Sequence, residues 1–320
     1  MKDLVVATFN VENLEDTDSN LWTVRKKVLG RMLEKIGAHV LLLQEVHSLT
    51  ALDDLLKGTS YERYNRAHTV SPSSGKPYRY RNLVILSEKT IVETKQYRND
   101  LADPPEWRKI TSLPEEDEAK RLSWERPILH SKVRLSGDHT LHVINLHLKS
   151  MNPTYVKGQR HEDKYWLWLS HQGWAEGYYI SDVKRVGQAL ETRILIDQIF
   201  DEDGDDALIV VGGDFNAEVG SVPFKAIVGS VEDTQNEALR TGVLIPCELN
   251  VPRDKRYSLI HHGKGNMLDH LVVSQALIPY WIDTEIYNET LHDESLAFAT
   301  DLKFPGSDHA PIRGNFRVPW

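Results

Sequence analysis

Short apolar runs recur along the chain, separated by polar segments or by segments of helical periodicity. Their brevity and their content of β-branched residues predict strands rather than helices. The runs are Leu4–Phe9, Val40–Leu43, Leu83–Leu86, Leu141–Leu148, Ala207–Val211, Leu268–Val273 and Ile312–Phe316.

Apolar residues at three- and four-residue steps predict two helices between these runs. Polar residues that can cap a helix stand before each pattern. The patterns are Leu21–Ile36, after Ser19 or Asn20, and Val183–Ile199, after Ser181 and Asp182. Many strands interspersed with helices favour an α/β fold in which helices cover two sheets.

Two segments show neither periodicity, and we interpret them as irregular. Residues 71–81 are rich in turn formers, and residues 151–182 form a long, aromatic-rich insertion between a strand and a helix. A long segment of this kind is often functional. The simpler explanation of the tryptophans in the insertion is that they form its core.

The composition is that of an ordinary soluble protein of 320 residues. No apolar run is long enough to span a bilayer, and the apolar start of the chain is too short for a signal peptide. The single cysteine, Cys247, cannot form an internal disulfide. We therefore expect a cytoplasmic protein with one buried, inert thiol.

Six polar signatures lie at the ends of apolar runs, where a strand exposes its terminal side chains at the rim of a sheet. Their Asn, Glu, Asp and His side chains are those needed to bind a hard divalent cation and to hydrolyse a phosphate ester. The signatures are Thr8-Phe9-Asn10-Val11-Glu12, Leu43-Gln44-Glu45-Val46, Asn145-Leu146-His147-Leu148-Lys149-Ser150, Gly213-Asp214-Phe215-Asn216-Ala217, Leu268-Asp269-His270 and Gly306-Ser307-Asp308-His309-Ala310-Pro311.

Each of these side chains alone has an ordinary explanation. Glu45 can be a surface glutamate, Asn10 a turn residue, and Asp214 with Asn216 an Asx turn after a strand. A histidine such as His309 titrates near neutrality and can exchange a proton at working pH. Because the signatures occur together, we favour the functional interpretation.

The order and spacing of the signatures, from Asn10 to His309, resemble the endonuclease/exonuclease/phosphatase superfamily in its bacterial, deoxyribonuclease I-like form. The resemblance implies a four-layer α/β/β/α sandwich with two mixed β-sheets. It also implies one catalytic domain over residues 1–320, interrupted by the insertion at about 151–182. Mg²⁺ or Mn²⁺ is the cofactor that the resemblance implies.

The resemblance assigns five residues to the catalytic chemistry. Asp214 matches the residue that orients or deprotonates the attacking water, and Asn216 matches the one that positions the phosphate. His309 is expected to contact the phosphate or to act as general base, oriented by Asp269. His147 is expected to support the leaving oxygen.

Metal and substrate contacts are implied in the same way. Glu45 matches the central metal ligand, Asp308 assists it, and Asn10 holds a metal-bound water or the phosphate. Weaker matches suggest substrate contacts. They are Asn82, Lys149 and Arg185, each as readily explained by a structural or solvated role.

The leading interpretation is a metal-dependent phosphodiesterase that hydrolyses nucleic acid, with DNA favoured. Aromatic rings of the insertion can stack bases, and several cations can bind phosphates. These cations are Lys76, Arg79, Arg81, Arg160, Arg253, Lys255 and Arg256. The alternatives are a phosphomonoesterase or a phospholipid or inositol-phosphate hydrolase with the same site, and an inactive binding module.

The formal net charge of −9 argues against a broad, non-specific binder of nucleic acid. It does not exclude a nuclease, because a metal site gathers carboxylates and the bound cation then presents the positive charge.

Overall fold

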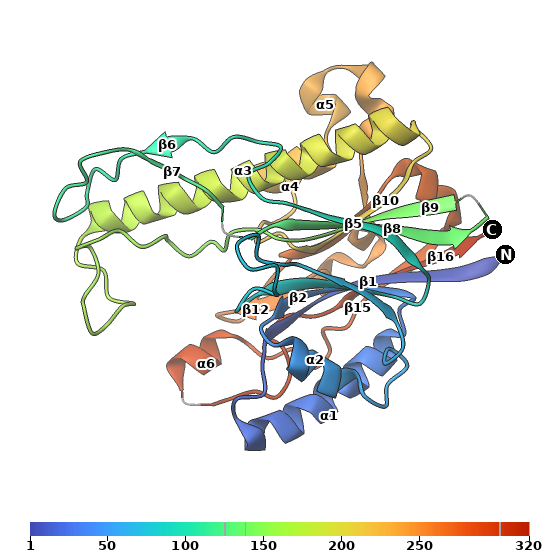
Figure 1. Cartoon of the computed structure of the whole chain (residues 1–320), viewed down its shortest axis with the longest axis horizontal. Coiled ribbons are helices and arrows are strands. Elements are labelled where there is room, and N and C mark those ends of the chain that lie inside the picture. The colour runs from blue at the N-terminus through green and yellow to red at the C-terminus, as the bar shows by residue number, and fades with distance from the viewer. Residues whose placement is uncertain (125, 138, 301, 320) are drawn as a thin grey trace.

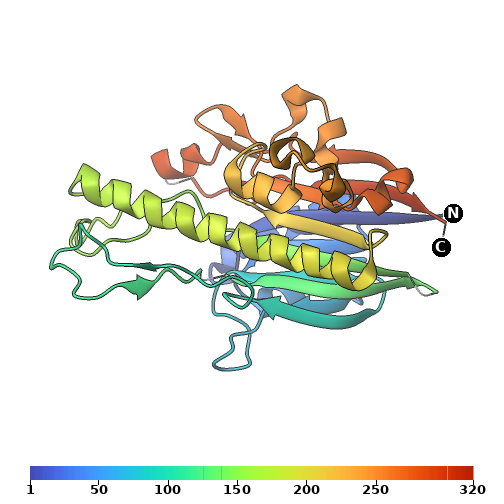
Figure 2. The ribbon, with the colours of Figure 1, turned by 90° about the horizontal axis from the view of Figure 1, so that it is seen from above.

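Two six-stranded sheets lie face to face, and helices cover the outer face of each (Figure 1, Figure 2). The computed structural model describes residues 1–124, 126–137, 139–300 and 302–319, apart from the side chain of Phe298. The architecture is the predicted α/β/β/α sandwich with two mixed sheets. No helix in the described ranges is both long and apolar enough to cross a membrane.

Both sheets have one parallel pair at the centre and antiparallel neighbours outside it. The first sheet has the order β15 (Trp281–Ile286), β16 (Ile312–Val318), β1 (Lys2–Leu14), β2 (Val40–Val46), β4 (Asn82–Ser87) and β3 (Asn65–His68). The second has the order β11 (Ile245–Pro246), β14 (Asp269–Val273), β10 (Leu208–Asp214), β9 (His139–His147), β8 (Ile128–Ser136) and β5 (Ile91–Tyr97). The two short hairpins are β6 (Glu106–Trp107) with β7 (Lys120–Arg121), and β12 (Leu259–His261) with β13 (Lys264–Asn266).

Helices α1 (Ser19–Ile36) and α2 (Leu49–Leu56) cover the first sheet, and α3 (His171–Asp203) and α4 (Val222–Val228) cover the second (Figure 1). The cap of α1 is Asp18, whose side chain accepts a hydrogen bond from the backbone N–H of Leu21 at 3.2 Å. The predicted caps Ser19 and Asn20 are therefore inside the helix. The remaining helices are short: α5 (Val231–Thr234), α6 (Ser295–Ala299), η1 (Glu237–Gly242), η2 (Cys247–Asn250), η3 (Arg253–Lys255) and η4 (Gln275–Tyr280).

Helix α3 begins well before the apolar pattern that predicted it. Its cap is Ser170, so residues 171–182 of the supposedly irregular insertion are helical. Polar contacts hold this extension: the Glu176 carboxylate accepts hydrogen bonds from Trp107 Nε1 at 2.9 Å and from the backbone N–H of Ile110 at 2.7 Å. Because the partners come from the segment between β5 and β8, which lies beside α3 in both views (Figure 1, Figure 2), local apolar periodicity did not reveal it.

Trp168 of the insertion is partly buried and packs against the local core, whereas its other two tryptophans are exposed. The side chains of Trp166 and Trp174 are 64% and 44% exposed. The small apolar core of this region is instead made by Leu122, Val156 and Ile180, which come from three separate segments.

Strict alternation along the central strands decides which residues reach the gap between the sheets. On β1, Leu4 and Val6 belong to the core between the sheets, whereas Val5, Ala7 and Phe9 pack under α1 and α2. The same alternation directs the polar residues that follow, Thr8 and Asn10, into the gap. On β9 it places Asn145 and His147 on the same face as Leu141 and Val143.

Candidate active site

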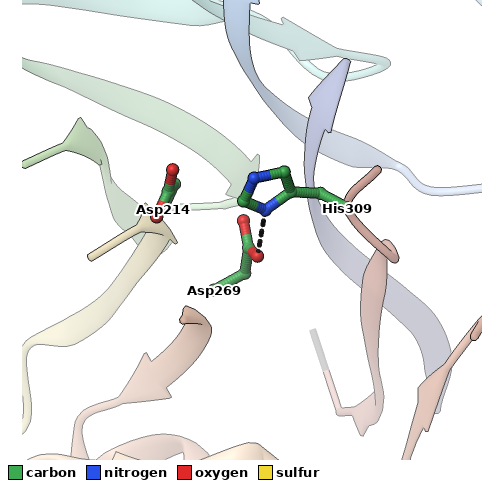
Figure 3. A group of neighbouring side chains, drawn as sticks. All are labelled: Asp214, Asp269 and His309. Atoms are coloured by element: carbon green, nitrogen blue, oxygen red, sulfur yellow. Dashed lines mark hydrogen bonds and ion pairs between the residues drawn. The ribbon is translucent and has the colours of Figure 1, made fainter. Parts of the chain in front are cut away.

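Strand register brings three of the predicted catalytic residues together. Asp214, the last residue of β10, lies opposite His147, the last residue of β9, and opposite Asp269, the first residue of β14. Side chains directly opposite each other project from the same face of a sheet. All three therefore point into the gap at one edge of the sandwich, where His309 meets them from the first sheet's side (Figure 3).

Asp214 is the most heavily hydrogen-bonded carboxylate of this group. Its Oδ2 accepts from Asn10 Nδ2 at 3.2 Å and from Asn216 Nδ2 at 3.1 Å, and it lies 3.2 Å from His147 Nε2. Burial alone raises the pKa of Asp214, but His147 and the other donors outweigh it and hold the pKa well below its usual range. Asp214 is therefore an ionised acceptor at working pH.

His309 and Asp269 form a pair that crosses from one sheet to the other. His309 precedes β16 of the first sheet, and its Nδ1 lies 2.6 Å from Asp269 Oδ2 (Figure 3). Burial lowers the pKa of His309, yet the Asp269 and Asp308 carboxylates overcome that effect and raise the pKa well above its ordinary value. The pair leaves the imidazolium Nε2 on the opposite side of the ring.

A second acidic group belongs entirely to the first sheet. Glu45 Oε1 lies 3.7 Å from His147 Nε2, and Asp308 Oδ1 lies 3.9 Å from His309 Nε2. Glu12 Oε2 accepts a hydrogen bond from the backbone N–H of Asp308 at 3.2 Å. Burial and the Asp308 charge raise the pKa of Glu12 to about 7, and burial together with Glu45 raises the pKa of Asp308.

Glu45 reaches the site because β2 is irregular at this point. Leu41 and Leu43 pack under α1 and α2, and simple alternation would send Glu45 to the same side. However, the pairing of β2 with β4 shifts register between Leu43 and Val46, and Glu45 has φ 59°. Bulges of this kind re-aim a side chain, and a left-handed non-glycine residue persists only where its surroundings require it.

The described residues offer two places for a divalent cation. One ligand atom from each of Asp214, Asp269 and His309 lies within 4.8 Å of the others. These groups are already hydrogen-bonded, and His309 has a raised pKa, so its positive charge balances the carboxylates.

The Glu45 and Asp308 side of the site fits a cation better. Asp308 Oδ1 is buried and has no hydrogen-bond partner among the residues that the structure describes. The raised pKa values of Glu12 and Asp308 indicate an excess of negative charge there. The guanidinium group of Arg25, 3.9 Å from Glu12, offsets only part of this charge. Hard oxygen ligands with excess negative charge suit Mg²⁺ or Mn²⁺.

Asn10 lies between the two groups. Its Nδ2 donates to Asp214, and its Oδ1 accepts from the backbone N–H of Glu12 at 3.0 Å. Both ends of the amide thus position acidic residues. The role of Asn10 as a metal or phosphate contact stays a prediction.

All three weaker assignments are used for other contacts, and Lys149 Nζ donates to the carbonyl oxygens of Ser150 and Asn152 at 3.1 and 2.9 Å. Asn82 donates to the carbonyl oxygens of Val46 and Tyr78 at 3.0 and 2.8 Å and accepts from the Tyr78 N–H, so it ties residues 71–81 to β2. Arg185 donates to the Lys149 carbonyl oxygen at 3.0 Å and pairs with Asp182. These side chains are engaged by the protein, and their roles as phosphate contacts stay predictions.

Sequence reasoning overlooked a buried polar brace directly below the site. Gln44 Nε2 donates to Asn145 Oδ1 at 2.7 Å and to Thr8 Oγ1 at 3.0 Å, and so connects the two sheets. Asn145 Nδ2 donates to the carbonyl oxygens of Leu43 and Val84, where the bulge interrupts the ladder. The sequence did hold a signal for this brace. Thr8 and Asn145 are polar residues on the inward faces of two apolar runs, two positions before Asn10 and His147 respectively.

His270, the neighbour of Asp269 in its signature, points away from the site. It lies on the opposite face of β14, with Nδ1 2.5 Å from Glu248 Oε1 and Nε2 2.8 Å from the carbonyl oxygen of Ala217. Its role is structural, since both ring nitrogens are used by the protein.

Comparison with known proteins agrees with this fold. The sequence profile of the Endonuclease/Exonuclease/phosphatase family matches residues 7–309, and the chain belongs to that family. Members of the family hydrolyse phosphate esters and generally depend on a divalent metal. A search of curated proteins found no match.

Solved structures of low sequence identity share the fold. An endonuclease/exonuclease/phosphatase from Bacteroides vulgatus is 18% identical, with a TM-score of 0.58, over 99% of this chain and 100% of that chain. Truncated TDP2 from Caenorhabditis elegans is 16% identical, with a TM-score of 0.59, over 99% and 98%. The mannosyl-6-phosphatase Bt3783 of Bacteroides thetaiotaomicron is 18% identical, with a TM-score of 0.57, over 97% and 98%.

Proposed function

We propose that this protein is a divalent-metal-dependent phosphodiesterase that hydrolyses nucleic acid, with DNA as the favoured substrate, by in-line attack of water. One observation carries the proposal. Two unlike sets of side chains face each other at one edge of the sandwich: Glu45 with Asp308, and the Asp214, His147 and Asp269–His309 group.

The first set would hold the cation. Glu45 and Asp308 are its ligands in this proposal, and the cation would neutralise charge that develops on the phosphoryl and leaving oxygens. Glu12 adds negative charge from the same side, and Arg25 fixes it by donating to the carbonyl oxygens of Val11 and Glu12.

The second set handles the water and the phosphate. Asp214, held ionised, accepts a hydrogen bond from the attacking water and takes its proton as the new P–O bond forms and the ester P–O bond breaks. His309, oriented by Asp269, donates from Nε2 to a phosphoryl oxygen. His147 lies between Asp214 and Glu45, where its Nε2–H can support the leaving oxygen.

A substrate panel tests this proposal. Plasmid DNA, single-stranded DNA, RNA, a chromogenic phosphodiester, a sugar phosphate and inositol phosphates are assayed with Mg²⁺, with Mn²⁺ and with excess chelator. We expect DNA cleavage that the chelator abolishes and that Asp214→Asn removes, whereas the exposed control Asp206→Asn has no effect. Full activity in chelator, or activity on monoesters alone, contradicts it.

The second candidate is a phosphomonoesterase with the same site. The mannosyl-6-phosphatase noted above shares the fold, and the groups that handle one phosphate do not depend on what is attached to it. Faster hydrolysis of sugar or inositol monoesters than of any diester favours this candidate. Metal binding without activity on any ester in the panel favours an inactive binding module instead.

A further inference from the structure

A second pocket adjoins the proposed active site. It has a volume of about 590 Å³ and lies between the loop before β4 and the segment after β9. A pocket of this size holds a small ligand or one unit of a larger one. The residues that matter for its chemistry are Arg79, Arg81, Arg126, Arg160, Tyr80 and Tyr155.

The pocket is strongly cationic in an acidic protein. Among the described residues that line it there is no Asp or Glu, although the chain has a net charge of −9. Arg79 and Arg81 form no ion pair with any residue that the structure describes. Two arginines without an ion pair attract an anion, and the guanidinium fork fits phosphate oxygens in particular.

The pocket opens next to the catalytic groups. Arg126 Nη1 donates to the Leu148 carbonyl oxygen at 2.9 Å, and Asn216 Nδ2 donates to the same oxygen at 3.1 Å. Arg126 and Asn216 therefore bind the same carbonyl oxygen, that of Leu148, the residue after His147.

Aromatic rings stand beside the arginines. Tyr80 and Tyr155 are 50% and 55% exposed, and the Arg79 guanidinium lies 4.9 Å from the centre of the Tyr80 ring. Deeper in, Arg160 lies 4.2 Å from the centre of the Trp168 ring. Its buried Nε has no hydrogen-bond partner among the described residues. Cations next to accessible rings are typical of sites that bind a phosphate and stack a base.

The loop of residues 71–81, which carries Arg79 and Arg81, is held in place by hydrogen bonds. Asn82 holds the loop through Tyr78, as described above, and the Ser71 N–H donates to the Lys76 carbonyl oxygen at 2.7 Å. Arg81 has φ 58°, a left-handed conformation that is uncommon for a side chain of this size. Such a conformation is kept where the direction of the side chain matters.

We propose that this pocket binds the nucleotide next to the scissile phosphate of a polynucleotide strand. Arg79, Arg81 and Arg126 bind the neighbouring phosphate, and Tyr80 and Tyr155 contact its base or sugar. The proposal rests on the nuclease function proposed above and names the part of the substrate that the catalytic groups do not reach.

The test compares substrates that do and do not fill the pocket. Wild type, Arg79→Ala/Arg81→Ala and the control Arg31→Ala/Arg134→Ala are assayed on a single-stranded oligonucleotide and on bis(p-nitrophenyl) phosphate. The control removes two exposed arginines that lie outside the pocket. We expect the ratio of kcat/KM for the oligonucleotide to kcat/KM for the chromogenic diester to fall at least about tenfold in the pocket variant only, because each lost phosphate contact weakens binding and its salt dependence. An equal fall for both substrates, or no fall, overturns the proposal.

A neutral linkage sharpens the same test. Methylphosphonate replaces the phosphate on one side or the other of the scissile bond, in separate oligonucleotides. We expect one of the two to slow wild-type cleavage at least about tenfold and to leave the pocket variant almost unchanged. Equal sensitivity of wild type and variant at both positions contradicts the assignment of that phosphate to the arginines.

Binding without catalysis separates this inference from the proposed function. A fluorescent nucleoside monophosphate is titrated into wild type and the pocket variant, with inorganic phosphate as competitor. Failure to cleave any polynucleotide refutes the proposed function. Arginine-dependent binding of the nucleotide still supports the pocket, and binding that ignores Arg79 and Arg81, or that inorganic phosphate matches in affinity, refutes it.

Discussion

The two sheets bring different chemistry to the same edge of the molecule. The first sheet's side contributes Glu45 and Asp308, and the buried Oδ1 of Asp308 has no hydrogen-bond partner among the described residues. The second contributes Asp214 and Asp269, each held by a histidine. Similar topology has thus produced two unlike sides of one site. We call the side with Glu45 and Asp308, where negative charge is in excess, the first wall, and the side with Asp214 and Asp269, whose charges are paired with histidines, the paired wall. The difference indicates where a cation binds and where water and phosphate are positioned.

The largest effect is expected from the paired wall. Asp214→Asn keeps the shape of the side chain but removes the ionised acceptor, and His309→Gln removes the cationic donor. We expect each to lower kcat by about 10²–10⁴-fold at saturating metal. Steady-state assays over a range of Mn²⁺ concentrations measure this, with Asp206→Asn as the exposed control. Recovery of activity at high metal would show that these residues act through the cation instead.

Variants of the first wall should differ from those of the paired wall, because added metal should restore their activity. Asp308→Asn keeps the volume but removes one negative charge from the proposed cation site. We expect about 10–100-fold weaker apparent metal affinity, a size typical of lost metal-site contacts. Activity should be largely restored when the metal concentration is raised. An unchanged metal optimum together with a lower kcat would move Asp308 into the paired wall.

The brace between the walls should matter for both stability and activity. Asn145→Leu leaves one N–H of Gln44 Nε2 and two carbonyl oxygens without their Asn145 partner, which costs about 1–3 kcal/mol of unfolding free energy. Urea denaturation measures this loss. In Gln44→Leu/Asn145→Leu only the part of the loss that comes from the Gln44–Asn145 contact should return, because the carbonyl oxygens of Leu43 and Val84 still lack their donor, while kcat stays several-fold low. Full recovery of kcat in the double variant would limit the brace to a structural role.

The smallest effect concerns histidines of the second sheet far from the site. His130 Nε2 lies 3.1 Å from His142 Nδ1, and burial, with the neighbouring His142, lowers the pKa of His130 to about 3. In the unfolded chain the imidazole of His130 becomes protonated near pH 6.5, whereas in the folded chain it does so only near pH 3. This contribution is therefore intact above pH 6.5 and is lost as the pH falls toward 3, by up to about 1.4 kcal/mol per pH unit.

Melting temperatures at pH 7, 6 and 5 measure that loss. We expect His130→Gln to lose less stability on acidification than wild type, whereas the exposed His171→Gln behaves like wild type. A wild-type melting temperature that does not fall between pH 7 and pH 5 contradicts the assignment.

The sequence was most informative where structure is local. An apolar run followed by a polar signature predicts both a strand and the position of its last side chain, and β9 and β10 follow that rule. The residues that the register then aligns, such as Asp214 with His147, needed only the correct strands.

Features that depend on distant contacts were not predictable in this way. The bulge that turns Glu45 into the site shows only in the pairing of β2 with β4. The early start of α3 depends on Glu176, whose partners lie some 65 residues away in the sequence. Strands β5 and β8 were missed as well, because residues such as Glu93 and Lys95 break the apolar run of β5 at the sheet edge.

The pocket beside the site shows the same limit. Arg79, Arg81 and Arg160 were candidate phosphate contacts from the sequence, and they line one pocket with Arg126, which was not a candidate. Arg256, also a candidate, instead donates to the carbonyl oxygens of Leu249 and Val251 in its own loop. Composition identifies cations, but only the fold decides which of them face a common space.

The measurement that tests the account most directly is Mn²⁺ binding by calorimetry in the absence of substrate. It compares wild type with Glu45→Gln/Asp308→Asn, which alters the first wall, and with Asp214→Asn/Asp269→Asn, which alters the paired wall. Each double variant removes two negative charges, so simple loss of charge affects both alike. The account predicts that binding is lost in the first variant and retained within about tenfold in the second. Loss of binding only in the second variant would place the cation among Asp214, Asp269 and His309 and contradict the division of labour between the two sheets.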